Sequence, residues 1–133
     1  MILLDTHIWI WWVSGHERLS VRHRELIEHH TTGGLAVSMI SCWEVAKKVE
    51  IGKPQFDRPV HEWLEQATTL GSVRMIDLTL PIILDSTRLP APFHRDPADQ
   101  LIVATSRVLN LPLVTEDNRL VSYPHVESVG IKE

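Results

Sequence analysis

The sequence lacks several features that define common protein classes. It contains one cysteine, Cys42, which excludes both an internal disulfide framework and a metal cage built from several cysteines. Such cysteine usage is typical of a reducing compartment, so we expect a cytoplasmic location. Asp5 interrupts the apolar start of the chain, which also lacks the basic residues and cleavage site of a signal peptide. No apolar run approaches the roughly 20 residues of a membrane-spanning helix, so we expect a soluble protein without a membrane partner.

An excess of basic charge is also missing. The 13 lysine and arginine residues face 17 aspartate and glutamate residues, which gives a formal charge of −4. This balance excludes a protein that coats nucleic acid through bulk charge, although an enzyme with a few local contacts remains compatible with it. The sequence has no repeats, low-complexity tracts or long linkers, and 44% of its residues are hydrophobic. We therefore expect one globular domain over residues 1–133.

Short apolar runs alternate with helical patterns along the chain. The apolar runs predict strands over 2–4, 35–39, 73–78, 111–114 and 127–129. The helical patterns and their end signals predict helices over 8–13, 19–30, 41–49, 59–70, 80–88 and 97–109, with Gly52 and Pro54 closing the third. Strands that alternate with helices in this way favour a parallel sheet covered on both faces. The expected fold is therefore a three-layer α/β/α domain with a central, mostly parallel sheet.

Acidic residues follow the predicted strands or begin the predicted helices. They are Asp5, Glu44, Asp96, Asp99 and Asp117. Ligands of open parallel sheets bind beyond the carboxyl ends of the strands, and helix starts that follow loops tend to lie at the same edge. We therefore expect these five carboxylates to face one region of the molecule.

Each of these acids except Asp5 also has a purely structural interpretation. Glu44 with Ser41 matches a capping box, and Asp96 and Asp99 suit the start of a helix. Asp117 followed by Asn118 is compatible with a simple turn. Asp5 is different, because a charged group beside a buried strand is costly unless it is paired.

A divalent cation is the natural compensation for several carboxylates in one cleft. Ligands that offer only oxygen atoms suit Mg²⁺ or Mn²⁺ better than zinc. Two such ions about 3.5–4 Å apart activate a water and stabilise the leaving oxygen of a phosphodiester. The acidic residues therefore favour hydrolysis of a phosphate ester.

The acids lie in four short motifs along the chain, which are Leu4-Asp5-Thr6-His7, Ser41-Cys42-Trp43-Glu44, His94-Arg95-Asp96-Pro97-Ala98-Asp99 and Leu113-Val114-Thr115-Glu116-Asp117. In this order and at this chain length, the motifs resemble those of PIN-domain nucleases, and more narrowly those of the VapC-type toxins of type II toxin–antitoxin pairs. The resemblance extends from residue 1 to about residue 129. It departs mildly from the family pattern after Asp99, where an Ile-Ala-Ala run reads Ile-Val-Ala.

The resemblance implies a set of site residues. The four family acids fall on Asp5, Glu44, Asp99 and Asp117, as catalytic residues and metal ligands, with Asp96 as an accessory acid. The small hydroxyl positions that flank such sites fall on Thr6 and Thr115, which we expect to contact the substrate.

The resemblance also implies an activity and partners. It implies a Mg²⁺-dependent endoribonuclease in which Mn²⁺ substitutes, with RNA as the substrate and a cognate antitoxin as the inhibitor. Family members commonly form homodimers and receive an antitoxin segment in a hydrophobic groove, so a homodimer and a toxin–antitoxin hetero-oligomer are expected.

Several other residues have two interpretations. Lys47, Lys48 and Arg95 lie near the acids in sequence and are either RNA contacts or ordinary surface charges. For His7 a packing or surface role is expected, and for Cys42 a buried thiol. The tryptophans Trp9, Trp11 and Trp12 suit stacking on RNA bases, the core or a partner interface, and we favour the interface.

Two other classes of protein compete with the nuclease. An enzyme that forms an aspartyl-phosphate also has an aspartate after its first strand, but it requires a second aspartate two residues later, where this chain has His7. A catalytically silent PIN-like module that binds RNA or protein is expected to lose acids, whereas this chain keeps them all. The RNA and its cleavage sequence stay open.

Overall fold

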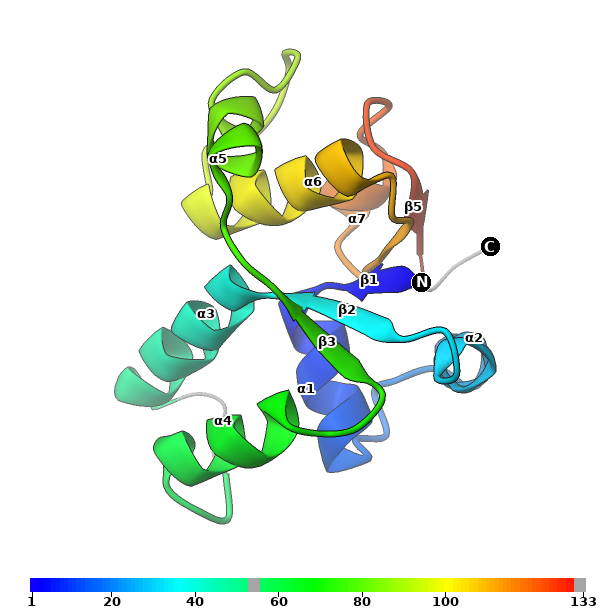
Figure 1. The fold of residues 1–133 in the computed structure, drawn as a ribbon, viewed down its shortest axis with the longest axis vertical. Coiled ribbons are helices and arrows are strands. Elements are labelled where there is room, and N and C mark those ends of the chain that lie inside the picture. The colour runs from blue at the N-terminus through cyan, green and yellow to red at the C-terminus, as the bar shows by residue number, and fades with distance from the viewer. Residues whose placement is uncertain (53–55, 131–133) are drawn as a thin grey trace.

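The computed structural model describes residues 1–52 and 56–130. Within these residues one five-stranded sheet runs in the order β3-β2-β1-β4-β5 (Figure 1). The strands are β1 (Ile2–Leu4), β2 (Leu35–Ser38), β3 (Val73–Ile76), β4 (Leu113–Val114) and β5 (Ser128–Val129). Every neighbouring pair is parallel, as the alternating sequence pattern predicts.

The first strand of the chain occupies the centre of the sheet. Leu3 pairs with Ala36 of β2 on one side and with Leu113 of β4 on the other. The chain builds β2 and β3 outward on one side of β1 and later adds β4 and β5 on the opposite side. The gap between β1 and β4 is therefore the point where the strand order reverses, and ligands of open parallel sheets bind at such points.

Successive residues of the central strand face opposite sides of the sheet, and each side has a core. Ile2 and Leu4 belong to one apolar cluster, whereas Leu3 belongs to the other. In β2, Val37 belongs to the cluster of Ile2 and Leu4, and Ala36 belongs to the cluster of Leu3. Because both faces are buried, these strands read as continuous apolar runs in the sequence.

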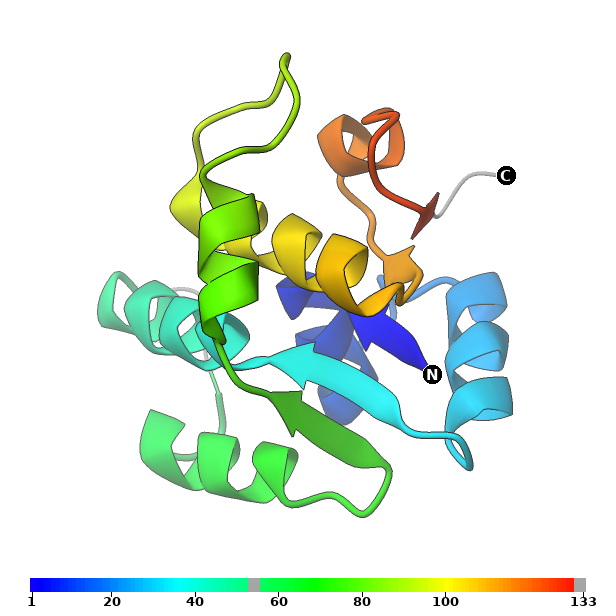
Figure 2. The same cartoon turned by 45° about the horizontal axis from the view of Figure 1, so that its top comes forward.

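Helices cover both faces, and Figure 2 shows the two outer layers. The helices α1 (Thr6–Ser14), α2 (Val21–His30) and α4 (Val60–Thr68) pack on one face, and α5 (Leu80–Ser86), α6 (Pro97–Leu109) and α7 (Asn118–Val121) lie on the other. The helix α3 (Met39–Glu50) follows β2 and contributes Val45 to one core and Ile40 to the other. The predicted three-layer α/β/α fold is therefore confirmed. None of the helices in the described part of the chain is long and apolar enough to cross a membrane.

End signals explain why the predicted limits of α6 match the structure. The Asp96 carboxylate accepts a hydrogen bond from the backbone N–H of Asp99 at 3.1 Å, and Pro97 occupies the first helical position. Asn110 ends the helix in the left-handed conformation, with φ 54°. The capping role expected for Asp96 is present in the fold.

The start of α3 differs from the prediction. The helix begins at Met39, because the Ser38 hydroxyl accepts a hydrogen bond from the backbone N–H of Ile40 at 3.2 Å. Glu44 therefore lies in the second turn of α3. The interpretation of Ser41 and Glu44 as a capping box is wrong. Gly52 follows the end of α3 with φ 92°, whereas the second predicted end signal, Pro54, lies outside the described residues.

The aromatic residues of α1 belong mainly to the core. Trp9 and Trp11 are only 0% and 6% exposed, and Trp9 packs edge-on against Trp63 of α4 with ring centroids 5.3 Å apart. A partner interface is therefore the wrong interpretation for these two residues, because α1 follows the central strand directly and lies under α4. Trp12 is half-buried against the same core. Cys42 is half-buried rather than buried, and its burial raises the pKa of the thiol.

Candidate active site

A cavity of about 270 Å³ lies beyond the carboxyl ends of β1 and β4. All five predicted acids line it together with four further residues: Asp5, His7, Glu44, Lys48, Asp96, Asp99, Glu116, Asp117 and Arg119. The acids come from four separate segments of the chain, and the parallel sheet brings these segments to one edge. The structure thus confirms that the five carboxylates share one region.

Asp5 is the most buried of these acids, with 6% of its surface exposed. Its Oδ1 accepts a hydrogen bond from the Thr6 backbone N–H at 2.8 Å, and its Oδ2 accepts one from the Thr115 hydroxyl at 2.7 Å. Asp5 forms no ion pair with the residues that the structure describes. Burial, reinforced by the charges of Asp99 and Glu44, raises the pKa of the Asp5 carboxyl to about 7, although both hydrogen bonds oppose this shift.

Thr115 connects two of the acids. Its hydroxyl donates to Asp5 and accepts a hydrogen bond from the backbone N–H of Asp117 at 3.0 Å. The side chain is fully buried. This predicted flanking hydroxyl therefore orients the carboxylates from beneath the cavity.

Glu44 faces the same cavity from α3. Its Oε1 accepts a hydrogen bond from the Thr6 hydroxyl at 2.5 Å, and its Oε2 lies 3.8 Å from Nζ of Lys48. Because Thr6 gives its only hydroxyl proton to Glu44, the Ser41 hydroxyl donates to Thr6 at 2.8 Å. Burial raises the pKa of Glu44, while Thr6 and Lys48 oppose the shift.

Asp99 lies in the first turn of α6 and has a histidine partner that the sequence did not reveal. Nε2 of His94 is 2.7 Å from Oδ2 of Asp99. Burial raises the pKa of Asp99, the His94 contact lowers it, and the neighbouring Asp96 raises it further. Asp96 itself is exposed at the cavity rim, as suits an accessory acid.

Arg119 is the second residue that sequence reasoning missed. Its Nη2 lies 2.9 Å from Oδ2 of Asp117 and 3.6 Å from Oδ2 of Asp99, so one guanidinium bridges two acids. The side-chain hydrogen bond from Arg119 lowers the pKa of Asp117. Asp117 also caps α7 through the backbone N–H of Arg119, at 2.9 Å. Arg119 follows Asp117 by two residues and lies in the first turn of α7, a helix of four residues that leaves no periodic pattern in the sequence.

The basic residues near the acids divide into two groups. Lys48 and Arg119 line the cavity, whereas Lys47 and Arg95 do not. Lys47 instead lies 3.3 Å from Glu50, on the exposed side of α3. His7 lines the cavity and contacts Trp11, so it neighbours the site as well as packing against α1.

The donor chemistry of the cavity fits a hard divalent cation. Asp5, Glu44 and Asp99 offer carboxylate oxygens, and the buried charge of Asp5 lacks a cationic partner among the described residues. As they stand, no three acidic, histidine or cysteine side chains of residues 1–52 and 56–130 are grouped to hold a metal ion. Magnesium usually takes only one or two carboxylates and keeps several waters, so it does not require such a group.

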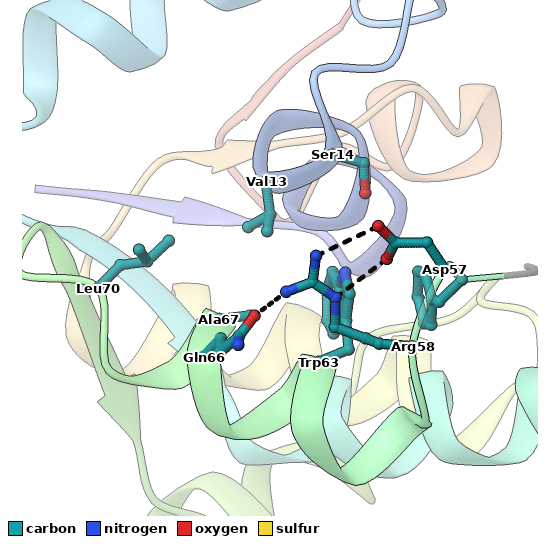
Figure 3. Close-up of a pocket in the computed structure, with 9 residues that line it drawn as sticks. Val13, Ser14, Asp57, Arg58, Trp63, Gln66, Ala67 and Leu70 are labelled. Atoms are coloured by element: carbon teal, nitrogen blue, oxygen red, sulfur yellow. Dashed lines mark hydrogen bonds and ion pairs between the residues drawn. The ribbon is translucent and has the colours of Figure 1, made fainter.

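A larger hollow of about 470 Å³ lies between α1 and α4, away from the acids (Figure 3). Arg58 lies there between Asp57 and Gln66, and its Nε is 3.0 Å from Oδ1 of Asp57. Trp63 and Phe56 stack beside them, with ring centroids 4.5 Å apart. The acid of this hollow is already paired, so the smaller cavity is the candidate active site.

Comparisons with known proteins agree with this fold. Residues 2–126 match the family model described as PIN domain. The chain is 38% identical over 130 residues to Ribonuclease VapC22 of Mycobacterium tuberculosis (strain ATCC 25618 / H37Rv), covering 98% of this chain and 97% of that protein.

Two solved structures share the fold. The crystal structure of VapBC2 from Rickettsia felis bound to a DNA fragment from their promoter matches with a TM-score of 0.73 and 18% identity over 98% of each chain. A toxin–antitoxin complex from Klebsiella pneumoniae matches with a TM-score of 0.66 and 22% identity, over 97% of this chain and 96% of that chain. The family-model match and the 38% identity show that the chain belongs to the PIN domain family, with a VapC-type ribonuclease as a relative.

Proposed function

We propose that this chain is a divalent-metal-dependent endoribonuclease and the toxin of a type II toxin–antitoxin pair. The observation that carries the proposal is Asp5, a buried acid without an ion pair in the described structure, at the strand reversal and facing Glu44 and Asp99. The relationship to VapC22, a ribonuclease by name, supports RNA as the substrate. The match of the family model over residues 2–126 supports one PIN domain over 1–133.

Asp5, Glu44, Asp99 and Asp117 are the residues that would hold the metal, with Asp96 at the rim. Mg²⁺ is the proposed cofactor, and Mn²⁺ should replace it because both prefer oxygen ligands in a similar geometry. When bound, the cation would supply Lewis acidity and a water of lowered pKa for hydrolysis of the phosphodiester.

Hydroxyl and imidazole groups of the chain hold the acids in place for this chemistry. Thr115 and Thr6 orient the carboxylates of Asp5 and Glu44, and His94 orients Asp99. These partners fix which carboxylate oxygens remain directed at the cavity. We therefore assign Thr6 and Thr115 as positioning residues rather than direct RNA contacts.

Arg119 and Lys48 supply the positive charge next to the acids. Arg119 bridges Asp117 and Asp99, and its planar guanidinium also suits two oxygens of a phosphate. Lys48 pairs with Glu44 on the α3 side. We propose that these two residues contact the RNA phosphate, while Lys47 and Arg95 attract RNA from outside the cavity.

The proposed partner is a cognate antitoxin. The fold matches come from structures whose titles name VapBC2 and a toxin–antitoxin complex, which supports an assembly of this kind. We propose a homodimer that binds antitoxin in a hetero-oligomer. Co-purification of the chain with the product of its neighbouring reading frame, and the mass of the complex, test this part separately from catalysis.

The decisive experiment measures cleavage of single-stranded RNA by the purified chain without antitoxin. Cleavage should require Mg²⁺ or Mn²⁺, and EDTA should abolish it. Cutting at a comparable rate in EDTA would reject the metal mechanism. RNA binding without cutting under all metal conditions would instead identify a catalytically silent module.

A further inference from the structure

An aromatic hollow of about 460 Å³ adjoins the acidic cavity. Phe93, Tyr123 and two prolines, Pro92 and Pro124, form its apolar wall. Arg119 lines both the hollow and the cavity, since it reaches Asp99 and Asp117 from between them. The two spaces therefore share one cationic side chain.

The rings of this hollow form a fixed platform. Phe93 stacks on His94 with ring centroids 4.4 Å apart and an interplanar angle of 24°. Tyr123 meets Phe93 edge-on at 4.7 Å and donates its hydroxyl proton to the carbonyl of Pro90 at 2.6 Å. His94 is held from the other direction by Asp99, at 2.7 Å. The stack of rings is thus held at one end by the Pro90 carbonyl and at the other end by Asp99.

We propose that this aromatic hollow binds one unpaired nucleobase of the RNA, next to the phosphate that is cleaved. The inference rests on the proposed ribonuclease function. It assigns a binding site to a base of the substrate that the acidic cavity does not contact. Phe93 is then a substrate-binding residue, and Arg119 contacts the phosphate between the base and the acids.

Three observations favour a base over another occupant. Single-stranded RNA is recognised by stacking of splayed-out bases on Phe, Tyr or His rings and on Arg guanidinium planes, and these groups line the hollow. Its volume lies within the range of small-ligand pockets. Among the described residues that line it, Arg119 is the one that carries a full charge, and this positive charge suits the backbone of a nucleic acid.

The test removes one base at a time from a single-stranded RNA oligonucleotide that the wild type cuts at one bond. An abasic site at one position beside that bond should raise KM about tenfold, as expected from the stacking energy of one base. Phe93→Leu retains apolar packing but removes the ring, so it should raise KM for the intact RNA by a similar factor. In this variant the abasic site should raise KM no further. Phe93→Tyr keeps an aromatic ring and should therefore retain the sensitivity to the abasic site.

The matched control is the other phenylalanine of the chain. Phe56 is also half-buried and stacked, against Trp63, but it lies in the distant hollow between α1 and α4. Phe56→Leu should keep the wild-type KM and the full sensitivity to the abasic site.

A second measurement uses the wild type alone and so does not depend on the folding of a variant. An RNA with 2-aminopurine at the sensitive position, mixed with the wild type in EDTA, should bind without cleavage and lose fluorescence through stacking. Unquenched fluorescence on binding, or full abasic sensitivity in Phe93→Leu, would overturn the base site while leaving ribonuclease activity intact. Failure of the wild type to cut any RNA would overturn the proposed function and this inference together.

Discussion

The Thr115 hydroxyl donates a hydrogen bond to Oδ2 of Asp5 at 2.7 Å and thereby joins residues that lie 110 positions apart in the chain. This bond stabilises the charged form of a carboxyl whose burial favours the neutral form. The end of β4 therefore controls how readily the acid at the end of β1 ionises.

Thr115→Val should shift the activity to higher pH, because it removes a bond that lowers the pKa of Asp5. Metal affinity should fall about 10- to 100-fold, the usual effect of removing a partner of a metal ligand. Thr115→Ser keeps the donor and should remain close to the wild type. The pH profile of RNA cleavage and a Mn²⁺ titration measure both effects. A Val variant with the wild-type profile would show that the hydroxyl has no influence on Asp5.

The carboxylates should differ in importance. Asp5→Asn and Asp99→Asn should each lower the cleavage rate by more than about 100-fold while the fold survives, since each removes a buried anionic oxygen. Asp96→Asn should be milder, because asparagine caps a helix about as well as aspartate. Asp57→Asn, on an exposed acid of the distant hollow, is the control. Wild-type turnover in Asp5→Asn would place the active site elsewhere.

Metal binding should stabilise the folded chain. A ligand at 100 times its dissociation constant raises the free energy of unfolding by about 2.7 kcal/mol, so Mn²⁺ should raise the melting temperature. The rise should be smaller in Asp5→Asn and Asp99→Asn and unchanged in Asp57→Asn. Thermal melts with and without Mn²⁺ provide the measurement. An equal rise in all four proteins would mean that the ion binds outside the acidic cavity.

The metal-free protein should lose stability as the pH rises. The pKa of Asp5 is about 7 in the folded state against 3.8 for the unfolded group, so between these values the folded state holds the extra proton. The free energy of unfolding therefore falls as pH increases from about 4 to 7, by at most roughly 4 kcal/mol from this group. The raised pKa values of Glu44 and Asp99 act in the same direction, and the lowered pKa of Asp117 acts against them.

Urea unfolding in EDTA at pH 5 and pH 8 tests this expectation. Comparison with Asp5→Asn removes the titration of this group together with its coupling to Asp99 and Glu44. The variant should gain stability relative to the wild type at pH 8. Parallel pH curves for the two proteins would exclude Asp5 as the source.

The sequence predicts those parts of the structure that depend on local signals and on strand ends. The limits of β1 and α6 match the prediction, because a short apolar run and two clear end signals define them. The gathering of the five acids also follows from sequence, since parallel strands bring their carboxyl ends to one edge. The structure confirms this gathering, whereas the catalytic role of each acid stays a prediction.

Contacts across the fold explain what the sequence leaves out. The pairing of His94 with Asp99 depends on the path of the loop before α6, and helical periodicity cannot show it. Arg119 lies on a helix of four residues, which is too short to produce a pattern. The sequence pattern predicts that α3 starts at Ser41, but Ser38 caps the helix and the Ser41 hydroxyl contacts Thr6 on another helix.

The central position of β1 has a consequence for the protein during its synthesis. A nascent chain on the ribosome carries Asp5 from the start, but β4, Thr115 and Asp117 emerge only near its end. Until then, one edge of β1 has no neighbouring strand, and the acid beyond it lacks both its hydroxyl donor and its opposing carboxylate. The acidic cavity is therefore not assembled until β4 has been made, so the proposed ribonuclease site forms only after most of the chain has been synthesised.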